Sequence, residues 1–146
     1  MKPILIAVAL FASTFTKSFA ADSPRIEPSV QKSFQATFAN AKEVDWSVTQ
    51  DLYKAVFFLN AQYVTAYFKE DGTMQAVTRH ITASNLPMLL QASLKSNYKG
   101  QWVSDVFEVT NDGTVQYYVT LEDADQKIIL KSSSATWSTY QKQRKD

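Results

Sequence analysis

Side chains suited to acid–base or metal chemistry are few in this chain of 146 residues, and their spacing assembles no reaction centre. His80 is the only histidine, which excludes a metal cluster built on several histidines. A Ser-His-Asp triad would depend on this one residue, which follows Arg79 and has no nucleophile motif nearby. We therefore interpret His80 as a structural or surface residue, and we predict that the protein is not an enzyme.

The acidic stretch at residues 122–125 carries carboxylates of the kind that bind calcium. It lacks the glycine and the distal glutamate of an EF-hand loop, so we interpret it as a polar hairpin loop and predict no metal site. Only three glycines occur, which leaves no glycine-rich loop to hold a phosphate. Because the chain has no cysteine, disulfides, haem attachment and thiolate metal sites are excluded. The sequence thus predicts no cofactor.

Aromatic residues in the predicted strands are better suited to recognition than to catalysis. Neither face is polar in the strands predicted at residues 53–60 and 63–69, whereas helices cover only one face of such a sheet. We expect some of the rings to face away from the helices, where Tyr and Trp supply contact area at low entropic cost. The alternative is that these rings cover one another, the loops or the tail. The predicted partner-binding residues are Phe58, Tyr63, Tyr67, Trp102 and Tyr118.

The elements that must position these rings occur twice along the chain. Residues 28–81 predict an amphipathic helix followed by four short strands, and residues 85–140 repeat that order at an offset of about 60–64 residues. Asp71-Gly72 and the run at residues 111–113 predict hairpin turns, and so does Asn60-Ala61. We predict one α+β domain at residues 28–141. In it, two tandem helix–four-strand units form an antiparallel sheet of up to eight strands, with two helices packed on one face.

Helical and strand periodicity assign particular residues to the core. We expect the first helix to begin at Pro28 and end near Asn40, and the second to have Pro87 in its first turn and to stop at Gly100. An i, i+4 stripe on the second helix is widened by Leu89, and the strand at residues 43–49 alternates with one apolar face. The predicted stripe is Leu86, Leu90, Leu94 and Tyr98, and the apolar strand face is Val44, Trp46 and Val48.

The N-terminus is typical of a secretory signal sequence. Lys2 provides the positive charge, and residues 4–15 form an apolar stretch too short to span a bilayer. Ser18 and Ala20 place small residues at the −3 and −1 positions, so we predict cleavage after Ala20 and a periplasmic or secreted protein. An uncleaved membrane anchor is the alternative.

Charge gives no reason to expect nucleic acid or a membrane surface as partner of the mature protein. Residues 21–146 carry 13 basic and 14 acidic side chains, which leaves the mature chain almost neutral. We expect residues 21–27 to be a flexible lead-in. Residues 142–146 read as a short polar tail that aids solubility.

Five strings along the chain carry a family resemblance: residues 38–46, Tyr53-Lys54-Ala55-Val56-Phe57, Ala66-Tyr67-Phe68, Asp71-Gly72 and Leu86-Pro87. With the order of elements, they resemble the PepSY-like family of secreted bacterial proteins, whose fold is compared with that of the beta-lactamase inhibitor protein (BLIP). The resemblance covers nearly all of the mature chain and is of the type found in Bacteroidetes. It implies an exported, non-enzymatic binding or inhibitory module with helices behind a concave sheet. The disulfides of that inhibitor are impossible here, so inhibition of a beta-lactamase is not expected.

Two functions fit these features best, and a structural or self-assembling role is a further alternative. The favoured hypothesis is an exported binding module that recognises a protein or peptide through the aromatic open face of the sheet, with peptidase inhibition as one version suggested by the resemblance. The alternative is a small-molecule or envelope-stress sensor that binds an apolar ligand between the sheet and the loops. The sequence identifies neither the partner nor the oligomeric state.

Overall fold

The structure is a computed structural model that describes residues 23–146. The predicted signal sequence and its cleavage after Ala20 lie outside the described residues. Across residues 23–146, no helix has both the length and the apolar character needed to cross a bilayer.

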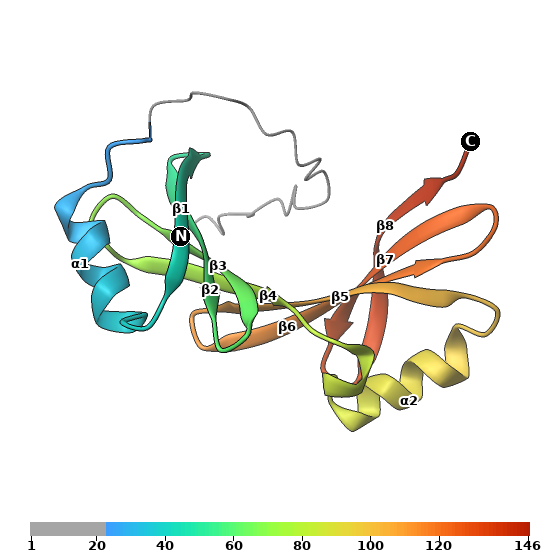
Figure 1. The fold of residues 1–146 in the computed structure, drawn as a ribbon. Helices are drawn as coiled ribbons and strands as arrows, with labels where there is room; N and C mark the ends of the chain where they lie inside the picture. Colours follow the sequence, from blue (N-terminus) through green and yellow to red (C-terminus); the bar gives the residue numbers. More distant parts are fainter. Residues whose placement is uncertain (1–22) are drawn as a thin grey trace, which may run out of the picture.

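Residues 23–146 form a single eight-stranded antiparallel sheet and two α-helices, which confirms the predicted α+β fold (Figure 1). Each strand pairs with the next one along the chain, so the sheet order is the sequence order. The recurring order of one helix and four strands is therefore present, while descent from a duplicated sequence stays a prediction. The helices are α1 (Pro28–Thr37) and α2 (Met88–Asn97), and a short 3-10 turn, η1 (Ala83–Asn85), precedes α2. The strands are β1 (Lys42–Thr49), β2 (Leu52–Leu59), β3 (Gln62–Phe68), β4 (Met74–His80), β5 (Trp102–Asn111), β6 (Thr114–Glu122), β7 (Gln126–Ser133) and β8 (Thr136–Arg144).

Both helices cover the same face of this sheet. Val77 of β4 packs against the core beneath α1, and Arg79, two residues along the strand, pairs with Glu108 of β5 on the same face. Val106, two residues before Glu108, belongs to the core beneath α2. Successive side chains along a strand point to opposite faces of the sheet, and residues paired across two strands point to the same face. The two cores therefore lie on one face of the sheet, and no helix covers the other face.

Core packing follows the predicted helix faces with a few corrections. In α1, Val30 and Phe34 are buried, and Pro28 occupies the first turn as expected. The helix ends at Thr37 instead of near Asn40, yet Phe38 still packs on the same core. Ile26, in the predicted lead-in at residues 21–27, is partly buried and packs against that core.

The second helix is shorter than predicted and its stripe is narrower. Leu90 and Leu94 are buried, whereas Leu89 is 67% exposed, so its assignment to the stripe was wrong. Pro87 precedes the helix, which begins at Met88 and ends at Asn97, before Gly100. Three or four residues separate neighbours on one helix face, and Leu89 is one residue from Leu90 and five from Leu94, so its side chain lies well round the helix from the buried pair.

Turn geometry explains why the strands pair with their neighbours. At Gln50-Asp51, Asn60-Ala61 and Asp112-Gly113, both turn residues have positive φ, which matches the twist of two-residue hairpins. Asp71-Gly72 behaves differently, because only Gly72 has positive φ (87°). There the Lys69 amide donates to the Thr73 carbonyl and the turn is longer.

The two edges of the sheet depart from the predicted pattern. On β1, Trp46 is half-buried but Val44 and Val48 are exposed, since an edge strand has a neighbour on one side only. A bulge between Lys42 and Asp45 also interrupts the expected alternation. At the other edge, β8 continues through Arg144, so most of the predicted polar tail is part of the sheet.

Candidate binding face

A row of rings crosses the helix-free face from β2 to β6. Phe58 pairs with Tyr63, His80 pairs with Phe107, and Phe107 pairs with Tyr118. Tyr63 and His80 lie one residue beyond the pair Val64–Arg79, so the row is continuous across the middle strands. We call these five residues the aromatic row. At about 4.8 Å between strands, the row extends over roughly 20 Å, the length of an extended peptide of about six residues.

Rings of this row pack edge to face in two pairs. The ring centroids of Phe58 and Tyr63 are 5.2 Å apart, and those of His80 and Phe107 are 4.8 Å apart. Tyr118 continues the contact to Tyr140 of β8 at 5.3 Å. Such contacts restrict ring motion, so less side-chain entropy is lost when a partner binds.

The predicted partner-binding residues all lie on this face but differ in accessibility. Tyr63 is 56% exposed and Trp102 is 53% exposed, while Phe58 and Tyr67 are half-buried. Tyr118 is only 5% exposed, so at this residue the alternative applies, in which the rings cover one another.

Curvature of the sheet explains why Tyr118 is buried without a helix above it. Figure 1 shows both helices on the outer side of a curved sheet, with the β1–β3 end and the β7–β8 end rising toward the opposite side. Phe107, Tyr118 and Ile129 form a buried cluster in the floor of this concave face. The accessible rings are therefore Tyr63 and Trp102, near the first residues of β3 and β5, while the floor itself is filled.

Charged groups hold both accessible rings in place. Tyr63 donates a hydrogen bond from its hydroxyl to Glu43 Oε2 at 2.7 Å, and this bond raises the pKa of Tyr63. Glu43 has a φ of 52° and lies in the bulge of β1, which directs its side chain toward Tyr63. Lys145 Nζ lies 5.0 Å from the Trp102 ring and 2.8 Å from Glu122 Oε2. The C-terminal Lys145 thus supports the face.

His80 lies at the centre of the row and is paired with a carboxylate. Its Nδ1 is 2.9 Å from Asp105 Oδ1, and this hydrogen bond raises the pKa of His80 against the opposing effect of partial burial. Arg79, on the other face, donates from Nε to Glu108 Oε1 at 2.7 Å. Each face of the β4–β5 seam, where the two helix–strand units meet, therefore has one ion pair.

The raised pKa of His80 predicts a small pH dependence of stability. Because the folded pKa lies above the unfolded value, the pair with Asp105 stabilises fully below about pH 6.5, and this contribution is lost as pH rises through the folded pKa. For a partly exposed pair we expect about 0.5 kcal/mol. Urea unfolding of the natural protein and of Asp105→Asn, each at pH 5.5 and at pH 8, measures this contribution to the free energy of unfolding. An equal effect of the substitution at both pH values would contradict the prediction.

The acidic loop at residues 122–125 has its central carboxylate occupied by N–H donors. Asp123 accepts from Gln101 Nε2, from the Asp125 and Gln126 amides and from Gln126 Nε2, at 2.9–3.1 Å. Led by the Gln101 bond, these interactions lower the pKa of Asp123 to about 2. Among residues 23–146, no group of three or more Asp, Glu or His side chains is arranged to hold a metal ion.

Three residues of the binding face were not predicted from the sequence. Phe107, Tyr140 and Lys131 join it through cross-strand register, and Lys131 Nζ lies 6.0 Å from the Tyr118 ring. Val106 and Phe107 are both apolar, so alternation alone does not show which of them faces the helices. A register assigned from the Asp112-Gly113 turn was the available signal for Phe107.

Comparison with solved structures decides the fold type. No family model and no curated protein matches the chain. A BLIP-like protein from Bacteroides fragilis superposes with a TM-score of 0.68 at 18% identity, covering 83% of this chain and 87% of that one. This chain has a BLIP-like fold. A DUF2874 family protein from Bacteroides uniformis gives a TM-score of 0.72 at 18% identity over 82% of this chain and 90% of that one.

A third solved structure is also similar in fold. It is a candidate periplasmic protein from Bacteroides eggerthii, with a TM-score of 0.72 and 16% identity over 83% of this chain and 90% of that one. At these identities the likeness establishes the fold alone. The expected resemblance to BLIP-like proteins of Bacteroidetes is confirmed at the level of structure, whereas the PepSY-like label stays a prediction.

Proposed function

We propose that this protein is an exported, non-enzymatic binding module that recognises a protein or peptide through the helix-free face of its sheet. The observation that carries the proposal is the aromatic row together with Trp102 on a concave face that no helix covers, where Tyr63 and Trp102 are exposed. Export is supported by the signal-like N-terminus and by the periplasmic description of one structural neighbour. Peptidase inhibition is one version, in which this face would contact the enzyme.

The geometry favours an extended or loop-like partner segment. Tyr63 lies near the start of β3 and Trp102 at the start of β5, and the floor of the concave face is filled by Phe107 and Tyr118. A flat partner would touch only the raised ends of the sheet, whereas a protruding segment enters the concave face and contacts the row. Lys131 and Glu43 add a cation at one end and a carboxylate at the other, which would fix the direction of that segment.

Removal of the accessible rings tests the proposal. Tyr63→Ala and Trp102→Ala are each expected to weaken binding about tenfold or more, because exposed aromatic anchors supply a large share of interface energy. The natural protein, tagged and exported, first captures its partner from a periplasmic extract, and the affinity of each variant for that purified partner is then measured.

Met88→Ala is the matched control, because Met88 is 83% exposed but lies on α2, on the opposite side of the sheet. It should leave affinity unchanged. Equal affinities for all the proteins, or failure of the natural protein to capture any partner, would count against the proposal.

A further inference from the structure

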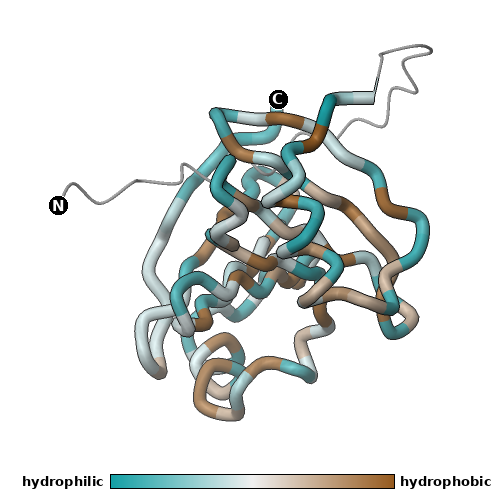
Figure 2. The backbone as a smooth tube through the Cα atoms, turned by 90° about the vertical axis from the view of Figure 1, so that its left-hand side faces the viewer, coloured by the Kyte–Doolittle hydropathy of each residue, from teal (hydrophilic) through white to brown (hydrophobic). Residues whose placement is uncertain are grey.

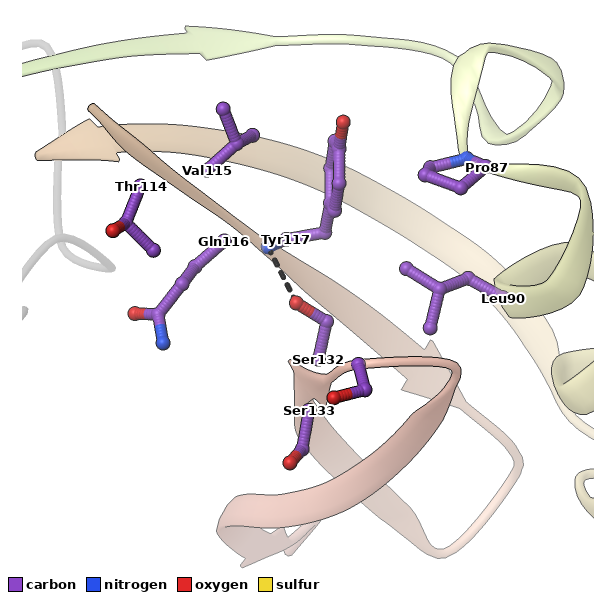
Figure 3. A pocket seen from close by; sticks show the side chains of 9 residues that line it. Pro87, Leu90, Thr114, Val115, Gln116, Tyr117, Ser132 and Ser133 are labelled. Atoms are coloured by element: carbon purple, nitrogen blue, oxygen red, sulfur yellow. Dashed lines mark hydrogen bonds between the residues drawn. The ribbon is translucent and has the colours of Figure 1, made fainter.

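A pocket of about 280 Å³ lies beside α2, away from the aromatic row, where β6 and β7 separate. The last cross-strand pair of these strands is Tyr118–Lys131. Beyond it, the backbone amide of Tyr117 donates to Ser132 Oγ at 2.9 Å instead of to a strand carbonyl (Figure 3). The first residues of β6 thus have a free edge that the β7–β8 hairpin leaves open.

The pocket has one apolar side and one hydroxyl-bearing side. Figure 3 shows Leu90 of α2, and Pro87 just before this helix, approaching the Tyr117 side chain. Ser132 and Ser133 face them from the β7–β8 hairpin, and Ser134 completes this side. None of the nine lining residues is charged. A carboxylate, phosphate or amine would therefore lose its hydration here without gaining an ion pair.

Several apolar side chains around the pocket are exposed to solvent. Met88 and Leu89 in the first turn of α2 are both exposed, as is Val115 of the pocket lining. Figure 2 shows brown, hydrophobic backbone at the lowest part of the molecule, the level at which α2 lies in Figure 1. The free edge of β6 at residues 114–117 is too short for stable addition of a peptide strand, which favours a small ligand.

We propose that this pocket binds a neutral small molecule with an apolar ring face and several hydroxyl groups, such as a single sugar unit. The Tyr117 ring and Leu90 contact the apolar face of the ligand, and the serine hydroxyls exchange hydrogen bonds with its hydroxyls. The volume is at the small end of the range for ligand sites, which fits one ring and its substituents. This site is independent of the proposed binding face, because Tyr63 and Trp102 take no part in it.

Amide NMR shifts of the isotope-labelled exported protein test the proposal. The probes are methyl α-glucopyranoside, methyl β-galactopyranoside and N-acetylglucosamine at millimolar concentration, with cyclohexanol and glycerol as controls that retain only the ring or only the hydroxyls. We expect at least one sugar to produce saturable shifts at Tyr117 and at residues 132–134, with the amides of Tyr63 and Trp102 unmoved. Affinity should fall about tenfold for either control compound.

Two variants separate binding from folding. Tyr117→Leu removes the ring, and Ser133→Val removes an exposed hydroxyl without entering the core. Each should weaken the sugar about tenfold while the far-ultraviolet circular dichroism spectrum is unchanged. Absence of a saturable shift with all three sugars would overturn the proposal. So would equal binding of cyclohexanol, or unchanged sugar affinity in Ser133→Val.

Discussion

Replacement of Phe57 by alanine is expected to lower the free energy of unfolding by about 3–5 kcal/mol. Phe57 has no solvent exposure, and its ring centroid lies 5.0 Å from that of Phe34 and 4.7 Å from that of Phe38. It therefore joins β2 to α1 at the centre of the first core. Alanine would leave a cavity that the sheet, paired on both sides of β2, does not collapse to fill.

Urea unfolding followed by circular dichroism measures this loss, and Val48→Ala is the matched control. Val48 lies on the same face of the neighbouring strand but is exposed, so its truncation should cost less than about 0.5 kcal/mol. A loss below about 1 kcal/mol for Phe57→Ala would show that the first core is not packed as described.

Gly72→Ala should destabilise the protein by about 2–4 kcal/mol, because two separate costs combine there. A Cβ atom at Gly72 would lie 2.6 Å from the carbonyl oxygen of Ser29, which is backbone at the start of α1. The φ of 87° also lies in the region that L-residues avoid. Ser29 is itself fixed, since its Oγ donates to the carbonyl of Glu70 at 2.6 Å. Either the turn or the helix must move to accept the new atom.

Gly113→Ala isolates the second of these costs. Gly113 has a φ of 74° but nothing within 4 Å of an added Cβ, so only the backbone cost of about 1–2 kcal/mol should appear. The difference between the two variants in thermal or urea unfolding measures the close approach of the β3–β4 turn to α1. Equal losses in both variants would contradict that contact.

Local patterns in the sequence account for most of the elements. Alternating residues predicted the strands, the i, i+4 leucines predicted the buried face of α2, and Asn60-Ala61 predicted a two-residue turn. Leu89 was misassigned because its apolar side chain next to the leucine stripe does not by itself show whether it faces the sheet or the solvent. The bulge at Glu43 was also missed, because a positive φ at glutamate has no signature in composition.

The sequence predicts which face of the sheet carries the candidate site, but it does not predict which side chains of that face are accessible to solvent. Alternation relative to Phe57 places Phe58 on the helix-free side, and the same reasoning holds for Tyr63 and Tyr67. Burial of Tyr118 depends on the curvature of the whole eight-stranded sheet. A short stretch of sequence does not determine that curvature. The pairing of His80 with Asp105 likewise depends on the register across the β4–β5 seam, which joins residues 25 positions apart.

Site-specific photo-crosslinking in the cells that produce the protein tests most directly whether the helix-free face is the recognition surface. A photoreactive phenylalanine analogue is placed at Tyr63 or Trp102 on this face, and at Met88 or Lys32 on the helix side, all exposed positions. If the helix-free face is the recognition surface, we expect one discrete adduct from Tyr63 and Trp102 and none from Met88 or Lys32. Adducts from the helix side alone, or the same adducts from all four positions, would contradict it.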